Sequence, residues 1–318
     1  MSKRVVNLHS FLAALMWVSF YLSKESFQYA MAEYVNSSYI RESKMIRPPR
    51  AAAAKSITEN GQCDITIIQI VVDQSGAGNY TTVQEAINSV SDNSTQRTII
   101  NIKAGTYVEK VTISLTTANI SLHGEGAGNT HIQWNDTAAT SGDTPNSASL
   151  SIDAPDFIAK DISFHNTAAF QGVQAVAVRV AGDRSAFYRC SFIGQQDTLY
   201  DVSGRHYFEQ CYIEGKVDFI FGNGQSLYKG CQINSTTDAS YGGYITAQGR
   251  NTSADESTGY SFVDCSIVGT GPTYLGRAWG NYARVIFSYT KMADIINPQG
   301  WKSSHEAVIG KKIRVWVS

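Results

Sequence analysis

The chain has 318 residues, 43% of them hydrophobic, and its 26 Lys and Arg residues almost balance its 27 Asp and Glu residues. This near-neutral charge argues against a nucleic-acid-binding protein. The length fits one large domain or two ordinary ones, and the apolar content is enough for a sizeable core.

The N-terminus has the pattern of an export signal. Lys3 and Arg4 precede an apolar run over residues 11–22, and Ala30-Met31-Ala32 offers a cleavage site with small residues at its first and third positions. The run is too short to span a bilayer. We therefore predict a secretory signal peptide over residues 1–32, with an uncleaved signal anchor as the alternative.

Residues 33–64 follow as a predicted linker. Asn-x-Ser/Thr triplets are acceptors for glycosylation in exported proteins, and their number here predicts that some of them carry glycans. The triplets begin at Asn36, Asn79, Asn93, Asn119, Asn135, Asn234 and Asn251.

Few segments of the chain have helical periodicity. The clearest spans residues 82–90, where Val83, Ala86, Ile87 and Val90 share one helical face, with Thr81 or Thr82 as N-cap. Much of the remaining chain alternates apolar and polar residues over short stretches that end in Gly or Asn. That pattern is typical of short strands followed by turns.

Four of the five cysteines recur in one such frame, with an aromatic residue three positions before the cysteine and an apolar residue two positions after it. The five are Cys63, Cys190, Cys211, Cys231 and Cys265. Their spacing fits neither a zinc knuckle nor a redox Cys-x-x-Cys motif. In an oxidising compartment, the odd number leaves at least one thiol free or paired between molecules.

The frames repeat at irregular intervals of roughly twenty to thirty-odd residues, which suits a coiled sheet. We predict an all-β fold, a right-handed parallel β-helix over residues 65–301, with the helix at 82–90 capping its N-terminal end. The recurring cysteines then form an inward ladder. A β-sandwich is the rival, but short hairpin signals between alternating runs are rare.

Two aspartates, Asp197 and Asp218, lie in short segments rich in apolar, aromatic, amide and glycine residues, at 194–200 and 215–223. A carboxylate in such surroundings is partly desolvated, so it needs a partner or a shifted pKa. Two carboxylates in unequal settings are suited to divide acid and nucleophile roles. The alternative is that both aspartates are structural residues of turns.

These segments belong to a set of motifs that resembles the plant pectin methylesterases, a carbohydrate-esterase family of parallel β-helix enzymes. The resemblance runs from about Ile70 to Trp301, and Ala278 stands where many members have proline. The motifs are Gly105-Thr106-Tyr107-Val108-Glu109, Gln174-Ala175-Val176-Ala177-Val178-Arg179-Val180, Gln195-Gln196-Asp197-Thr198-Leu199-Tyr200, Asp218-Phe219-Ile220-Phe221-Gly222-Asn223 and Leu275-Gly276-Arg277-Ala278-Trp279.

The resemblance implies a role for each matching residue. Asp218 matches the nucleophile, Asp197 the general acid that later acts as base, and Gln174 and Gln196 the amides that hold the oxyanion. The residues expected to contact substrate are Arg277, Trp279, Thr144, Phe219 and Tyr200.

The resemblance also implies a disulfide between Cys231 and Cys265. The expected substrate partner is pectin, that is, methyl-esterified homogalacturonan in the cell wall, and a proteinaceous inhibitor is a further partner. We expect a secreted monomer with no cofactor. The scattered histidines and the absence of a His-Glu-x-x-His motif imply no metal site, and no Gly-x-Ser-x-Gly elbow supports a serine esterase.

Two other functions stay open. A β-helix glycosidase or lyase would use the same carboxylates on pectin. A non-catalytic wall protein is the second alternative, because residues 302–318 do not match the family and form an atypical tail, which we expect to cap the coil poorly.

Overall fold

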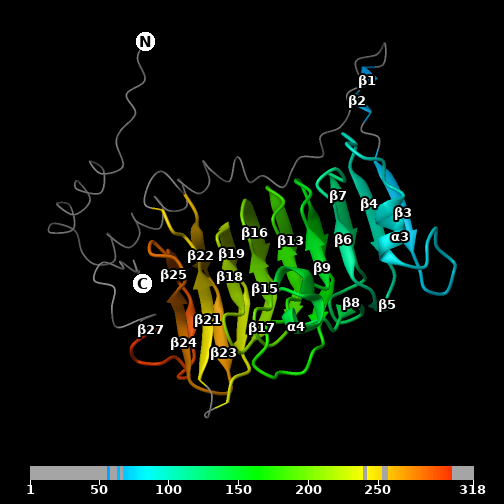
Figure 1. Cartoon of the computed structure of the whole chain (residues 1–318). Coiled ribbons are helices and arrows are strands. Elements are labelled where there is room, and N and C mark those ends of the chain that lie inside the picture. Colours follow the sequence, from blue (N-terminus) through cyan, green and yellow to red (C-terminus); the bar gives the residue numbers. More distant parts are fainter. Residues whose placement is uncertain (1–55, 58–62, 65–66, 239–241, 253–256, 303–318) are drawn as a thin grey trace, which may run out of the picture. The chain divides into compact units, whose positions relative to one another are not determined.

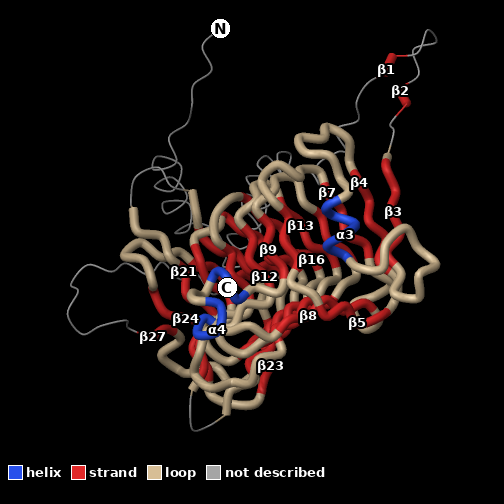
Figure 2. Tube along the Cα trace, turned by 45° about the vertical axis from the view of Figure 1, so that its right-hand side comes forward, coloured by secondary structure: helices blue, strands red, loops and turns tan. Residues whose placement is uncertain are grey.

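The computed structural model describes residues 56–57, 63–64, 67–238, 242–252 and 257–302. All of them belong to the compact unit that spans Pro48–Val317. Between residues 67 and 302, short strands follow one another into three parallel sheets, and from Thr98 onward each turn of the chain contributes one strand to each sheet in order (Figures 1 and 2). This arrangement confirms the parallel β-helix.

Sheet one has 9 strands among the described residues. In chain order they are β3 (Ile68–Val72), β4 (Thr98–Ile102), β7 (Ile120–His123), β10 (Ile158–Lys160), β13 (Ser185–Tyr188), β16 (Arg205–Glu209), β19 (Gln225–Lys229), β22 (Gly259–Val263) and β25 (Val285–Ser288).

Sheet two has 8 described strands. They are β5 (Gly105–Val108), β8 (Thr130–Trp134), β11 (Ser163–Asn166), β14 (Ser191–Ile193), β17 (Tyr212–Gly215), β20 (Gln232–Ser235), β23 (Ser266–Gly269) and β26 (Lys291–Met292).

Sheet three also has 8 described strands, and it carries the candidate site. They are β6 (Val111–Ile113), β9 (Leu150–Ile152), β12 (Val178–Val180), β15 (Leu199–Asp201), β18 (Ile220–Gly222), β21 (Gly243–Gln248), β24 (Thr273–Ala278) and β27 (Trp301–Lys302).

Parallel in-register pairing makes equivalent side chains stack along the inside of the coil. The aromatic residues that precede the four cysteines form such a stack under sheet one, and Phe157 and Phe287 extend it at its two ends, with neighbouring ring centroids 4.5–5.6 Å apart. Its members are Phe157, Phe187, Phe208, Tyr228, Phe262 and Phe287. The frame seen in the sequence is therefore the core of the fold.

The N-terminal turn is covered by the predicted helix. Helix α3 (Val83–Asn88) buries Val83, Ala86 and Ile87 against the first turn, and the Thr82 hydroxyl caps it by accepting from Glu85 N at 3.3 Å. The Glu109 carboxylate accepts from the backbone N–H groups of Val83 and Gln84 at 2.8 and 3.0 Å, so this motif residue caps the same helix.

The recurring cysteines form the expected buried ladder, but the predicted Cys231–Cys265 disulfide is wrong. Both are free thiols, as are Cys190 and Cys211. Cys231 Sγ donates to Phe208 O at 3.5 Å and Cys265 Sγ to Tyr228 O at 3.4 Å, each on the preceding turn. The register of the coil stacks these thiols next to one another without joining them.

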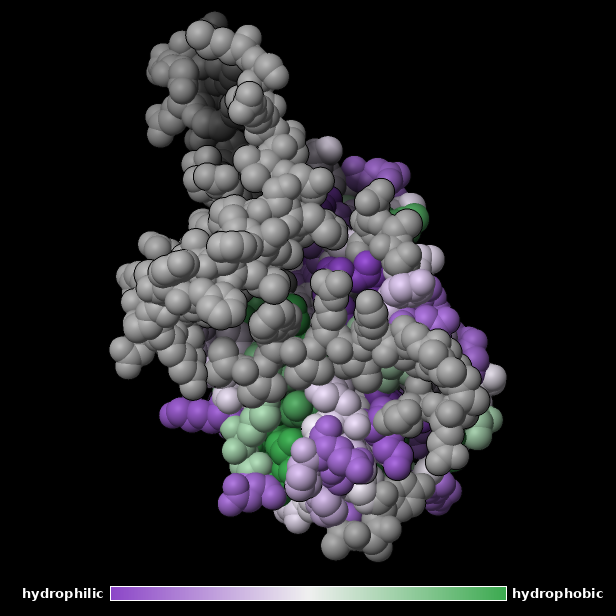
Figure 3. Space-filling view, turned by 90° about the vertical axis from the view of Figure 1, so that its left-hand side faces the viewer, coloured by the Kyte–Doolittle hydropathy of each residue, from purple (hydrophilic) through white to green (hydrophobic). Residues whose placement is uncertain are grey.

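The C-terminal turn packs partly buried apolar side chains against the end of the core. These are Met292, Ile295, Ile296 and Trp301. Figure 3 views this end of the coil and shows apolar residues gathered among hydrophilic ones. The predicted tail lies outside the described residues apart from Lys302, so our expectation about its capping stays a prediction.

The predicted signal peptide also lies outside the described residues. Within the predicted linker, β1 (Ser56–Ile57) pairs antiparallel with β2 (Cys63–Asp64). None of the helices in the described part of the chain is long and apolar enough to cross a membrane.

Candidate active site

Asp197 and Asp218 occupy equivalent places on adjacent turns, where the chain passes from sheet two to sheet three. The bridge Gln196↔Val217 lies just before the two aspartates, and the pair Leu199↔Ile220 lies just after them. Asp197 and Asp218 are therefore in register. Both residues have left-handed backbone conformations, with φ of 66° and 48°. Non-glycine residues pay a conformational cost there, and such residues cluster at functional sites.

Asp218 is held by a charged partner. It is 1% exposed, and the Arg277 guanidinium donates to it from Nε at 2.9 and 3.0 Å and from Nη2. Burial raises the pKa of Asp218, and the hydrogen bonds and charge of Arg277 oppose that rise. A bidentate guanidinium therefore favours the ionised carboxylate and fixes its orientation.

Asp197 has no such partner. It is 3% exposed, and burial, together with the charge of Asp218, raises the pKa of Asp197 to about 8, with Arg277 opposing the rise. One carboxyl of the pair is thus suited to hold a proton at neutral pH while its neighbour is ionised.

Gln174 and Gln196 lie on successive turns beside the two aspartates. Ala175 N donates to Gln196 O at 3.0 Å, which places the two glutamine segments side by side. Both side chains are half-buried, and neither amide has a hydrogen-bond partner among the described residues. Their donors are available to a ligand.

The outer face of sheet three carries an aromatic surface next to the aspartates. Tyr200 and Phe221 stack with centroids 4.3 Å apart, and Trp279, 56% exposed, meets Phe221 edge-on at 6.2 Å. Phe221 itself is 3% exposed, so Tyr200 and Trp279 are the rings that a ligand can reach. Phe219 differs from our expectation. It is fully buried in the main core cluster, because the side chain next to Asp218 points into the coil, so it has no face to offer a sugar ring.

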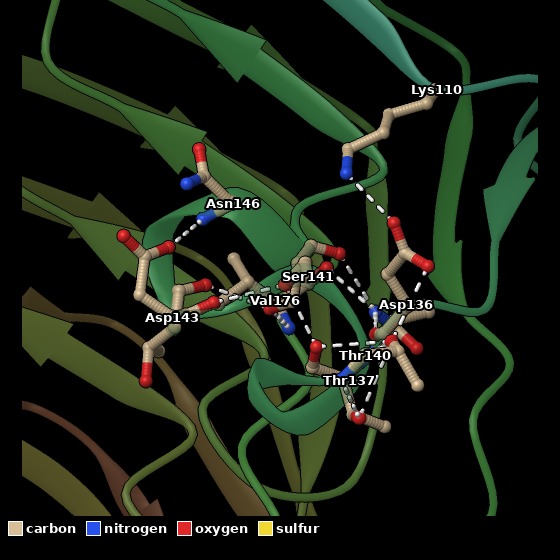
Figure 4. Close-up of polar contacts among 11 residues, drawn as sticks. Lys110, Asp136, Thr137, Thr140, Ser141, Asp143, Asn146 and Val176 are labelled. Carbon is tan, nitrogen blue, oxygen red and sulfur yellow. Dashed lines mark hydrogen bonds and ion pairs between the residues drawn. The ribbon is translucent and has the colours of Figure 1, made fainter.

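Thr144 lies on a loop that crosses this face and contains α4 (Ala138–Ser141) and η1 (Pro145–Ser147). Thr144 begins η1, but its hydroxyl makes no capping hydrogen bond. Figure 4 shows the polar contacts of the loop, including Asn146 N to Asp143 Oδ1 at 2.8 Å and Lys110 Nζ to Asp136 Oδ2 at 2.7 Å.

Two further contacts join this loop to the glutamine segment. Ala138 N donates to Gln174 O at 2.8 Å, and Val176 N donates to Ser147 Oγ at 3.0 Å. The buried Asn166 amide donates to carbonyls of Asp136, Ser147 and Val176 at once. The loop and Gln174 are therefore positioned as one unit.

The sequence analysis did not single out Asn166 or Tyr244. The Arg277 guanidinium lies 5.4 Å from the centroid of the Tyr244 ring, so this tyrosine helps to position the partner of Asp218. Neither residue belongs to a motif with an obvious chemical role, and only the register of the coil brings them to the site.

Within the described ranges, His, Cys, Asp and Glu side chains do not gather in groups of three or more that could hold a metal ion. The site is built from carboxyl, guanidinium, amide and aromatic groups. With one buried carboxyl group of raised pKa, one carboxyl group bound by a guanidinium, and free amide donors, it has the parts needed for nucleophilic acyl transfer.

Comparison with known proteins identifies the family. The profile of the Pectinesterase family matches residues 69–312, well over half of the chain. The chain belongs to the pectinesterase family. The match extends past residue 301, where we predicted that the β-helix domain ends. It therefore includes part of residues 302–318, which we predicted to be an atypical tail.

Arabidopsis thaliana contains similar members of the pectinesterase family. The chain is 47% identical to probable pectinesterase 8 over 76% of its own length and 64% of the relative's. It is 49% identical to pectinesterase QRT1 over 73% and 63%, respectively. The chain thus spans a little under two thirds of each of these relatives.

Solved structures of pectin methylesterases have the same fold. The carrot enzyme matches with a TM-score of 0.73 and 34% identity, over 78% of this chain and 88% of that one. A pectin methylesterase in complex with a hexasaccharide matches with a TM-score of 0.67 and 27% identity, over 79% and 93%.

Proposed function

We propose that this chain is a secreted carboxylic ester hydrolase that removes methyl esters from the galacturonate residues of pectin in the cell wall. The observation that carries this proposal is the unequal carboxyl pair, with Asp218 held by Arg277 and Asp197 buried with its pKa raised to about 8. Family membership and the pectin methylesterase structures support the substrate class.

In the first half of the reaction, a carboxylate oxygen of Asp218 attacks the carbonyl carbon of the ester. The carbonyl oxygen becomes an oxyanion, which the Gln174 and Gln196 amides stabilise without neutralising the nucleophile. The carbon–methoxy bond then breaks, Asp197 gives its proton to the departing oxygen, and methanol leaves. An acyl–enzyme anhydride on Asp218 remains.

In the second half, Asp197 is ionised and accepts a proton from water. The resulting hydroxide attacks the acyl carbon, and a second oxyanion forms in the same place. Its collapse releases galacturonic acid, which loses its remaining proton to solvent, and restores ionised Asp218 and protonated Asp197. Because the cycle begins with a proton on Asp197, the rate of methanol release should fall as the pH rises through about 8.

The test is to measure methanol release and polymer length together on highly esterified pectin. The proposal predicts one methanol for each new carboxylate, with no change in polymer length. Shortening of the polymer without methanol would instead support the glycosidase or lyase alternative. The absence of both would support a non-catalytic wall protein.

A further inference from the structure

Lys216 is a cation beside the carboxyl pair that the proposed chemistry does not use. It lies two residues before Asp218, in the passage from β17 to β18. Its backbone N–H donates to Gln195 O at 2.6 Å, and its carbonyl accepts from Tyr244 N at 3.1 Å. Lys216 is therefore fixed between the segments that carry Gln196 and Tyr244.

The side chain of Lys216 extends toward the turn that carries Gln174. Its Nζ lies 4.8 Å from the ring centroid of Phe170, in the connection between β11 and β12. That connection belongs to a turn two places earlier along the coil, at a spacing of about 4.8 Å per turn. Lys216 and Phe170 thus span the edge of the site beside Gln174, Gln196 and Asp218.

No ion pair in the described part of the chain includes Lys216. The two carboxylates nearest to it in sequence are engaged elsewhere. Asp218 binds Arg277, while Glu214 accepts from Tyr212 Oη and from Asn234 Nδ2, the latter at 2.9 Å. A half-buried ammonium that faces an aromatic ring and has no carboxylate partner is suited to an anionic ligand.

We propose that Lys216 binds a free galacturonate carboxylate next to the ester under attack, which makes it a specificity-determining residue for partly de-esterified pectin. This inference rests on the proposed function. Each turnover converts a neutral ester into a carboxylate, so the product of one reaction creates the group that Lys216 recognises. The chain would then favour esters that border galacturonate residues already de-esterified.

The first experiment compares kcat/KM on pectins of equal length that are either highly or partly esterified. Wild type should prefer the partly esterified polymer. Lys216→Gln should lower this preference about two- to fivefold, which is the usual effect of one partly exposed ion pair. Lys216→Arg should keep the preference, because it keeps the charge.

The matched control is Lys229→Gln on β19, an exposed lysine in sheet one that also lacks a described ion pair. It should leave the preference unchanged. An equal loss of kcat/KM on both pectins in Lys216→Gln would show that Lys216 only positions the loop that contains Phe170. That result would overturn the proposal. A wild type without any preference would overturn it as well.

The second experiment separates this inference from the esterase activity. Calorimetry measures binding of a fully de-esterified oligogalacturonate, a probe that needs no turnover. Wild type should bind it more tightly than Lys216→Gln, and salt should weaken the difference. Equal binding would refute the carboxylate site and leave the esterase proposal intact. Lys216-dependent binding without methanol release from esterified pectin would refute the esterase proposal alone.

Discussion

At the scale of single residues, the site depends on two aspartates with the same backbone conformation but different neighbours. Both lie in left-handed turns on adjacent turns of the coil, and both are buried. Arg277 reaches only Asp218 with hydrogen bonds, so the charge of the pair is concentrated on that carboxylate. The sequence predicted unequal settings for the two, but not which contact makes them unequal.

The raised pKa of Asp197 predicts how stability depends on pH. The folded pKa of about 8 lies above the unfolded value of about 3.9, so the folded state binds this proton more tightly. The resulting stabilisation is fully present below about pH 4 and is lost as the pH rises through 8. Melting temperature should fall over that range, and less steeply in Asp197→Asn.

Asp183→Asn is the matched control for this measurement. Hydrogen bonds from Arg205 lower the pKa of Asp183 to about 2, so its contribution is present above about pH 4 and is lost as the pH falls toward 2. The variant should therefore keep the slope between pH 4 and 8. An unchanged slope in Asp197→Asn would contradict the assigned proton.

The two free amides predict a kinetic signature. Gln174→Ala and Gln196→Ala should each lower kcat about 10²–10³-fold with little change in KM, because the amides stabilise a charge that exists only in the transition state. Gln195→Ala, in the same segment, should change kcat far less. If both variants mainly raise KM, the glutamines bind substrate and do not form the oxyanion hole.

At the scale of elements, the cysteine frames predicted the stacking of the turns but not the state of the thiols. The frames correctly indicated a ladder of equivalent buried positions. Spacing along the sequence does not decide whether stacked thiols are joined. In the structure the buried ladder of Cys190, Cys211, Cys231 and Cys265 consists of free thiols.

This ladder predicts a clear result in thiol labelling. Native protein should protect all four thiols, since they are buried and burial raises the pKa of Cys190 to about 12. After unfolding without reductant, an alkylating reagent should modify all four. Recovery of a peptide pair that links Cys231 to Cys265 would contradict this structure.

The turn from β15 to β16 contains a buried histidine–carboxylate hydrogen bond that should matter for stability. Asp201 Oδ1 and His206 Nδ1 are 2.6 Å apart, both side chains are fully buried, and Tyr228 Oη donates to Asp201 Oδ2 at 2.8 Å. His206→Ala leaves Asp201 without its main partner, so the free energy of unfolding should fall by about 3–5 kcal/mol in urea titrations.

The control for His206→Ala is the partly exposed pair Lys110–Asp136, with side chains 37% and 26% exposed. Lys110→Ala should cost at most about 1 kcal/mol. Similar losses for the two variants would mean that the buried pair contributes no more than a surface contact.

At the scale of the whole molecule, the sequence predicted the parallel β-helix and its N-terminal helix because both depend on local periodicity. The stack of aromatic residues and the helix at Val83–Asn88 follow directly from that pattern. The contacts of Asn166 and the position of Tyr244 against Arg277 join different turns of the coil. They depend on loop lengths and register, which no local pattern encodes.

Phe219 illustrates the same limit. Its place beside Asp218 in a catalytic motif suggested contact with substrate, whereas the alternation of the chain directs its side chain into the core. Outside sheet three, the register stacks Tyr200 on the buried Phe221, so Tyr200 and Trp279 offer the accessible aromatic faces instead.

The central claim is that Asp218 is the nucleophile of an esterase. The most direct measurement is methanol release from esterified pectin by wild type and by Asp218→Asn, with melting temperatures to confirm that both are folded. The account predicts steady release by wild type and none above background by the variant, because an amide cannot attack the ester. Substantial release by a folded Asp218→Asn protein would contradict it.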